Sequence, residues 1–168
     1  LLFLEDAAQC DGGVYLGRNS GSLGDVSSFS FYGNKTFTTG EGGICLTNDE
    51  SLCARMRILR DHGANPHKRY WHDVVGFNYR MTNLQAAVGV AQLERLDQFV
   101  ARKREIAACY ASAFEALAAE GIVTIQPSPS WATCTFWMNC LLIPHRDRSP
   151  TRDDLLSGLT QREIEVRP

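Results

Sequence analysis

The stretch from Ser28 to Gly43, SFSFYGNKTFTTGEGG, decides the interpretation of this 168-residue chain. It contains one lysine, Lys35, between a run of alternating polar and aromatic residues and a glycine-rich turn. The alternation has a period of two, which predicts a β-strand over residues 27–31 with one buried face. Gly40 and the glycines after it permit a turn with positive φ. Lys35 is therefore predicted at the end of a strand, where its amine can attack a carbonyl carbon.

A nucleotide-binding loop is one alternative for this stretch, because Gly33, Lys35 and Thr36 resemble the end of such a motif. The motif needs glycine and lysine side by side, with another glycine five positions before the first. Asn34 separates the two residues here, so the spacing excludes this motif. Without further motifs, a lysine in a Gly/Thr loop is most often a solvated surface charge.

The second element is the apolar run Leu1–Leu4, which ends in the two carboxylates Glu5 and Asp6. It predicts a buried parallel strand with Asp6 at its carboxyl end, where ligands bind in open α/β sheets. The distance in sequence to Lys35 suffices for a crossover back to the same sheet edge. A carboxylate for a pyridinium nitrogen and a lysine for an aldehyde are the pair that pyridoxal phosphate requires.

Four motifs follow one another along the chain: Glu5–Gln9, Gly24-Asp25, Ser28–Gly43 and Gly76–Ala87. Together they resemble the DegT/StrS family of nucleotide-sugar aminotransferases over the whole length of the chain. The resemblance implies an α/β fold, namely fold type I of the pyridoxal phosphate aminotransferases. It implies that residues 1–100 form the latter part of the large cofactor-binding domain, and residues 101–168 most of the small C-terminal domain.

The same resemblance implies roles for single residues. Lys35 would hold pyridoxal 5'-phosphate covalently and then act as a base, while Asp6 keeps the ring nitrogen protonated. Gln9 would lie near the ring oxygen, and Ser30 would contact the cofactor phosphate. Asn78 would reach the cofactor phosphate of the partner subunit in a homodimer.

Residues 64–80 are polar and aromatic without a helical or strand period, which predicts a long loop. Loops of this length are commonly functional or disordered. Large exposed aromatics usually contact a ligand or partner, so Tyr70 and Trp71 are candidate substrate-binding residues. Arg80 is a third candidate, for the phosphates of a nucleotide-sugar.

The activity implied by the resemblance is transfer of an amino group, from glutamate as donor, to a nucleotide-linked keto-deoxysugar. Such sugars serve cell-surface polysaccharide or antibiotic synthesis. Residues 68–72 and 76–83 are most similar to perosamine-synthase-type members, which implies GDP-4-keto-6-deoxymannose as the acceptor. Relatives that remove a sugar hydroxyl instead carry histidine in place of the lysine, so Lys35 disfavours that chemistry.

A second alternative is a non-catalytic truncated remnant or binding module of the same family. The resembled family carries a phosphate-binding turn and a ring-stacking aromatic before the motif that contains Asp6, and neither occurs here. The start at Leu1 and the end at Pro168 lead us to expect a fragment.

Composition sets broader limits. A net charge of −2 argues against nucleic acid or a membrane surface as a partner, and no apolar run has transmembrane length. Six cysteines without a C-x-x-C pair predict reduced core thiols in a cytoplasmic protein, and the cysteines and histidines do not combine at metal-site spacings. At 44% hydrophobic content the length suffices for one sizeable core.

Local signals predict the remaining elements. Asp49 begins a helix that Gly63 ends, and Thr82 begins another through a capping box with Gln85. The other expected elements are a helix over 97–120, strands over 122–125 and 135–143, a helix over 149–162 and a strand over 164–166. Trp137 lies among alternating aromatics, which favours a core position.

Overall fold

The computed structural model describes residues 1–144 and 150–168. The chain divides into two compact units. The first comprises Leu1–Glu105 and Ser128–Trp137, and the second comprises Ile106–Pro127 and Met138–Pro168. The two-domain assignment made from the sequence, with its boundary at residue 100, refers to the complete enzymes of the family and stays a prediction.

The main sheet of the first unit has the order β1-β4-β5. Strand β1 (Leu4–Asp6) runs parallel to β4 (Val26–Ser30), and β4 runs antiparallel to β5 (Gly43–Leu46). Asp6 lies opposite Ser28 in the register. Two predictions are confirmed: β1 lies in a parallel pair, and a strand precedes Lys35. The carboxyl ends of β1 and β4 meet at one edge of the sheet.

Strand β1 buries a charged residue rather than its apolar neighbours. Glu5 is 9% exposed, and its carboxylate accepts hydrogen bonds from the backbone N–H groups of Gly21 (2.7 Å), Leu23 (2.9 Å) and Gly24 (3.4 Å). Leu1 to Leu4 are exposed in the part of the chain that the structure describes, so the prediction that this run is buried is wrong. Among the described strands, only β4 pairs with β1, and the strand alternation turns Glu5 inward.

A second sheet of the first unit joins distant parts of the chain. β2 (Val14–Tyr15) and β3 (Arg18–Asn19) form a hairpin, and β7 (Ala132–Thr133) pairs with β2. This pairing brings residues 128–137 against the N-terminal region. The prediction of a strand over residues 135–143 is wrong for all but the end of that range. Phe136 adopts a positive φ of 58°, which an extended strand does not allow.

Two helices of the first unit begin as the sequence predicts. The side chain of Asp49 accepts hydrogen bonds from the first turn of α1 (Glu50–Arg60). Thr82 and Gln85 form the predicted capping box of α2 (Asn83–Leu93). Each side-chain cap satisfies backbone N–H groups that have no partner inside the helix.

The C-terminal elements differ more from the prediction. The helix expected over 97–120 is divided at Phe114 into α3 (Leu96–Ala113) and α4 (Glu115–Ala119), because Phe114 has φ −99° and ψ 3°. In the second unit β6 (Thr124–Ile125) pairs with β8 (Leu141–Leu142). The helix predicted over 149–162 forms as α5 (Arg152–Thr160), with Ser149 outside the described residues. Residues 164–166 form no strand.

Few apolar side chains are buried. Among the described residues these are Ala7, Phe37, Val100, Ala107 and Val123, so the expectation of a sizeable core is wrong. The prediction of core cysteines also fails, since Cys10, Cys45, Cys109 and Cys140 are exposed. Their apolar runs lie on exposed faces, as in β5, where every residue is exposed. No described helix is long and apolar enough to cross a membrane.

Candidate active site around Lys35

Lys35 lies in the connection between β4 and β5, which its own backbone closes into a defined loop. The N–H of Phe31 donates to Gly42 O (2.8 Å), and the N–H of Thr39 donates to Phe31 O (3.0 Å). The Phe31 and Phe37 rings pack at 4.7 Å between centroids inside the loop. The aromatic residues of the motif therefore shape the loop that carries the lysine.

Helix α2 holds the far side of this loop. The N–H of Thr38 donates to Gln92 Oε1 (3.3 Å), and Gln85 Nε2 donates to Glu41 O (3.1 Å). Gln85 is also the residue that completes the capping box of α2. The start of α2 and the position of the Lys35 loop are thus set by the same side chain.

Trp137 contacts Lys35 from a distant part of the sequence. Its Nε1 donates a hydrogen bond of 2.7 Å to Asn34 O, and Lys35 Nζ lies 4.3 Å from the centroid of its ring. The backbone oxygen of Trp137 accepts a hydrogen bond from Lys103 Nζ at 3.2 Å. Sequence reasoning placed Trp137 in the core, but it is half-buried against the lysine loop. No local motif marked this contact, because it joins segments about a hundred residues apart.

Three other predicted residues lie near the same sheet edge. Asp6 is the last residue of β1 and is exposed, with Oδ1 accepting from the N–H of Ala8 at 3.0 Å. Ser30 is the last residue of β4. Gln9 is exposed in the turn after β1. The structure thus gathers Asp6, Ser30 and the Lys35 loop around the carboxyl ends of two paired strands, as their predicted roles require; the roles themselves stay predictions.

A buried polar cluster that the sequence did not reveal lies beside Lys35. Asp11 is 3% exposed and Thr36 is 8% exposed. Among the described residues, Asp11 Oδ2, Asn34 Oδ1 and Thr36 Oγ1 are buried without a hydrogen-bond partner. Burial raises the pKa of Asp11 to about 6, and the positive charge of Lys35 partly opposes that rise. Burial also raises the pKa of Cys10, as does the charge of Asp11.

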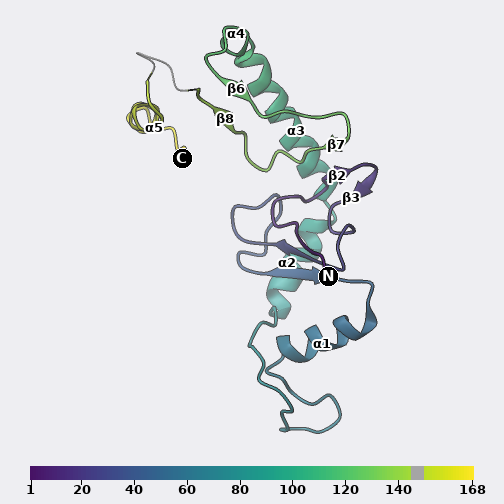
Figure 1. Ribbon diagram of the computed structural model, residues 1–168. Helices are drawn as coiled ribbons and strands as arrows, with labels where there is room; N and C mark the ends of the chain where they lie inside the picture. The colour runs from purple at the N-terminus through teal and green to yellow at the C-terminus, as the bar shows by residue number, and fades with distance from the viewer. Residues whose placement is uncertain (145–149) are drawn as a thin grey trace. The chain divides into compact units, whose positions relative to one another are not determined.

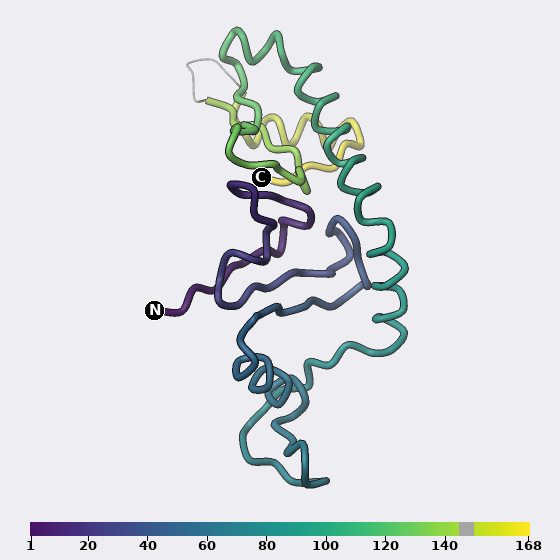
Figure 2. Tube along the Cα trace, turned by 90° about the vertical axis from the view of Figure 1, so that its right-hand side faces the viewer, coloured from purple at the N-terminus to yellow at the C-terminus, as the bar shows by residue number. Residues whose placement is uncertain are grey.

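The remaining predicted residues lie elsewhere in the first unit. The backbone of Asn78 bridges to Asp61, just after α1, and Arg80 Nε lies 3.2 Å from Asp61 Oδ1. Tyr70 is 85% exposed, and Trp71 Nε1 donates to Asp73 Oδ1 (2.9 Å). Figures 1 and 2 show the segment of residues 61–80 extending beyond α1, away from β2 and β3. The structure does not bring these four residues to the Lys35 loop of the same chain.

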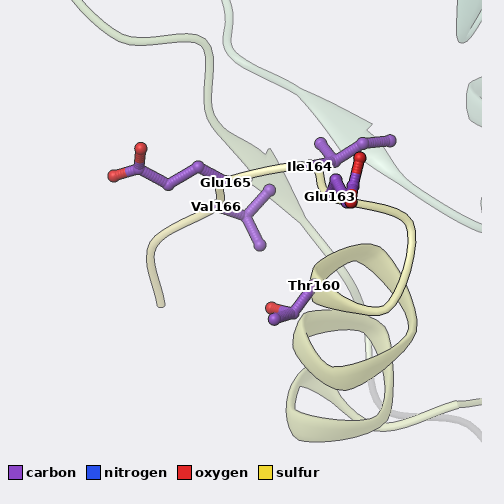
Figure 3. Close-up of a pocket in the computed structure, with 5 residues that line it drawn as sticks. All are labelled: Thr160, Glu163, Ile164, Glu165 and Val166. Carbon is purple, nitrogen blue, oxygen red and sulfur yellow. The ribbon is translucent and has the colours of Figure 1, made fainter.

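The residues around Lys35 suit pyridoxal phosphate by their chemistry. An exposed carboxylate, a serine hydroxyl and a lysine amine lie around one sheet edge, and unpaired polar atoms of Asn34 and Thr36 flank the lysine. The described residues hold no cluster of metal-ligating side chains. A pocket in the second unit, lined by Thr160, Glu163, Ile164, Glu165 and Val166, contains none of the predicted site residues (Figure 3).

The family model of the DegT/DnrJ/EryC1/StrS aminotransferases matches residues 1–168. The chain belongs to this family. Its members are aminotransferases that depend on pyridoxal phosphate, so the predicted family and cofactor class are confirmed. The chain is 46% identical to the GDP-perosamine synthase of Caulobacter vibrioides and 43% identical to that of Escherichia coli O157:H7. Each match covers 100% of this chain and 44% of the relative.

Solved structures agree on the fold. The S. venezuelae protein DesV, solved in complex with a ketimine intermediate, superposes with a TM-score of 0.82 at 32% identity, over 98% of this chain and 42% of DesV. The aminotransferase from Psychrobacter cryohalolentis gives a TM-score of 0.84 at 30% identity, over 96% of this chain and 45% of its own. The predicted α/β fold of the pyridoxal phosphate aminotransferases is therefore confirmed, and the chain spans less than half the length of these relatives.

Proposed function

We propose that this chain supplies the lysine-bearing part of an enzyme that transfers an amino group to a keto group on a nucleotide-linked deoxysugar. The observation that carries the proposal is the Lys35 loop, held by α2 and Trp137 beside the carboxyl ends of β1 and β4. Family membership supports the reaction class. The names of the relatives from C. vibrioides and E. coli support a GDP-linked sugar, and we propose GDP-4-keto-6-deoxymannose as acceptor and glutamate as donor.

Each side chain has a role that its position allows. When bound, pyridoxal phosphate supplies a ring that accepts the electron pair released at the carbon that bears the amino group. Lys35 Nζ would hold the cofactor through its carbonyl carbon and, when free, would act as the base that moves a proton. Asp6, exposed at the end of β1, would pair with the protonated ring nitrogen. Ser30 would donate to the phosphate, and Gln9 would face the ring oxygen.

The residues of the 61–80 segment fit a role in a homodimer. Asn78 and Arg80 lie beside Asp61 at the end of α1, rather than at the Lys35 loop. We therefore propose that Asn78 contacts the cofactor phosphate of the partner subunit. Tyr70, Trp71 and Arg80 bind the nucleotide-sugar, since exposed rings and a guanidinium suit a base and phosphates. A cytoplasmic location stays a prediction.

Transfer of nitrogen from ¹⁵N-glutamate to the GDP-linked keto sugar tests this proposal directly. We expect product that carries ¹⁵N with pyridoxal phosphate and the full-length protein that contains this chain, and none when that protein carries Lys35→Ala. Arg102→Ala is the control, because Arg102 is an exposed cation of α3 that pairs with Glu105 and has no proposed role in the site. Binding of cofactor and sugar without nitrogen transfer would instead favour the non-catalytic binding module.

A further inference from the structure

The 64–80 loop carries two neighbouring pairs of a cation and an aromatic ring. Lys68 Nζ lies 3.7 Å from the centroid of the Trp71 ring, and Arg69 Cζ lies 4.7 Å from the centroid of the Tyr70 ring. Tyr70 adopts a positive φ of 60°, which bulky side chains seldom accept outside turns and functional sites. Trp71 is 50% exposed and Tyr70 is 85% exposed. The loop therefore presents aromatic rings and positive charges together at an exposed position.

Asp73 fixes the orientation of the Trp71 ring. Its Oδ1 accepts a hydrogen bond from Trp71 Nε1 at 2.9 Å, and its Oδ2 accepts one from Asn65 Nδ2 at 2.6 Å. The indole N–H is a donor at the edge of the ring, so a bond at this atom restrains rotation of the ring plane. The Asp73 carboxylate thus joins the Trp71 side chain to the start of the loop.

Asn65 holds the two sides of the loop together. Its backbone N–H donates to Trp71 O at 2.8 Å. Its side-chain Oδ1 accepts from the N–H groups of His67 (2.7 Å) and Lys68 (2.8 Å). Asn65 therefore positions both the Asp73 carboxylate and the backbone that carries Lys68. A ring that the fold itself restrains loses less conformational entropy when a ligand stacks on it.

We propose that Asp73 is a positioning residue that orients Trp71 as a stacking surface for the base of a nucleoside diphosphate. Lys68 occupies one face of the ring, and the base stacks on the opposite face. An aromatic ring suits this role because every base has a π face. The ammonium group of Lys68 and the guanidinium group of Arg69 suit the phosphates. The proposal rests on the proposed function in taking a nucleotide-linked sugar as the substrate.

The sign of the effect of Asp73→Ala separates positioning of the ring from simple electrostatics. Removal of an anion beside an anionic ligand should by itself tighten binding, whereas loss of the oriented ring should weaken it. The probe is GDP, titrated calorimetrically into the full-length protein that contains this chain. We expect Asp73→Ala to raise the Kd of GDP about five- to tenfold. Asp73→Asn keeps an oxygen that accepts from Trp71 Nε1, so its Kd should stay within about twofold of the wild type.

A double-mutant cycle tests whether Asp73 acts through the ring. In a Trp71→Leu background, Asp73→Ala should not raise the Kd of GDP further, because the ring that it orients is gone. His72→Ala is the control for loosening of the loop. It removes the contact of His72 Nδ1 with His62 O (3.0 Å) and leaves the bond between Trp71 and Asp73 in place. Its Kd for GDP should stay within about twofold of the wild type.

Asp153→Ala controls for the loss of an exposed carboxylate, because Asp153 pairs with Arg152 in the second unit, and it should leave the Kd of GDP unchanged. Tighter or unchanged binding of GDP by Asp73→Ala would overturn the proposal. Equal rises in Kd for Asp73→Ala and His72→Ala, or no binding of GDP to the wild type, would also overturn it. Nitrogen transfer that persists beside any of these results would leave the proposed function standing. The expected changes in Kd without nitrogen transfer would instead contradict the proposed function alone.

Discussion

Trp137 Nε1 donates a hydrogen bond of 2.7 Å to the carbonyl oxygen of Asn34, across 103 residues of sequence. The bond fixes the backbone directly before Lys35, and the same indole ring lies 4.3 Å from Lys35 Nζ. The position of the lysine therefore depends on a segment that local sequence does not connect with it.

The burial of Asp11 makes stability depend on pH. Its pKa of about 6 exceeds the ordinary value of 3.8, so folding favours the protonated form. This contribution to stability is complete below pH 3.8 and is lost as the pH rises through 6. Asp11→Asn removes this pH-dependent loss of stability. We expect the free energy of unfolding of the variant to rise relative to that of the wild type by on the order of 1–3 kcal/mol between pH 4 and pH 7.

Denaturant titrations of the wild type and Asp11→Asn at pH 4, 5, 6 and 7 measure this difference. Subtraction of the two curves cancels the titration of all other groups. A difference in the free energy of unfolding that is constant over this range would show that Asp11 titrates no differently in the folded and unfolded chain.

The adjacent carboxylates Glu5 and Asp6 should respond differently to removal. Glu5 accepts three backbone hydrogen bonds and is buried, so Glu5→Ala should lower the free energy of unfolding by about 2–4 kcal/mol. Asp6 is exposed, and Asp6→Ala should cost less than about 1 kcal/mol while it weakens cofactor function. Thermal unfolding of both variants, with cofactor absorbance for Asp6→Ala, checks this contrast. Similar losses in the free energy of unfolding for Glu5→Ala and Asp6→Ala would contradict the assignment of a structural role to Glu5 and a cofactor role to Asp6.

The capping box of α2 should affect the cofactor as well as stability. Thr82→Ala removes the cap and frees Gln85, which donates to Glu41 O in the Lys35 loop. We expect a loss of about 1 kcal/mol in stability and a weaker affinity for pyridoxal phosphate. Thr151→Ala is the control, since it removes the capping box of α5 in the second unit. Both variants should lose stability, but only Thr82→Ala should raise the Kd of the cofactor.

Mixed dimers test the role proposed for Asn78. One subunit carries Asn78→Ala and the other Lys35→Ala, so only one of the two sites retains its lysine. If Asn78 acts in the partner's site, the site that keeps Lys35 still receives Asn78 from the Lys35→Ala subunit and binds the phosphate normally. Weakened phosphate binding at that site would place Asn78 in the site of its own chain.

The sequence predicted those parts of the fold that local chemistry decides. Asp49 and Thr82 place the starts of α1 and α2 because a side-chain cap needs only its own first turn. Alternation placed β4, and the apolar run before Asp6 predicted its parallel partner. The interruption at Phe114 and the positive φ of Phe136 have no such local signal.

The candidate site shows the same division. Motif residues such as Lys35 and Ser30 follow from the strand and turn that carry them, so sequence reasoning identified them. Asp11 and Trp137 became visible only once β7 paired with β2, which places the 128–137 segment against the lysine loop. The burial of Asp11 beside a lysine is a tertiary property, and its own sequence context is that of a glycine-rich turn.

Covalent trapping at Lys35 tests the central claim most directly. The chain is incubated with pyridoxal phosphate and reduced with borohydride, and the modified lysines are located by peptide mapping. We predict a label concentrated on Lys35, with Lys68 and Lys103 modified only at the level found in denatured chain. A label spread evenly over the three lysines would contradict the claim that these residues form an organised site for the cofactor.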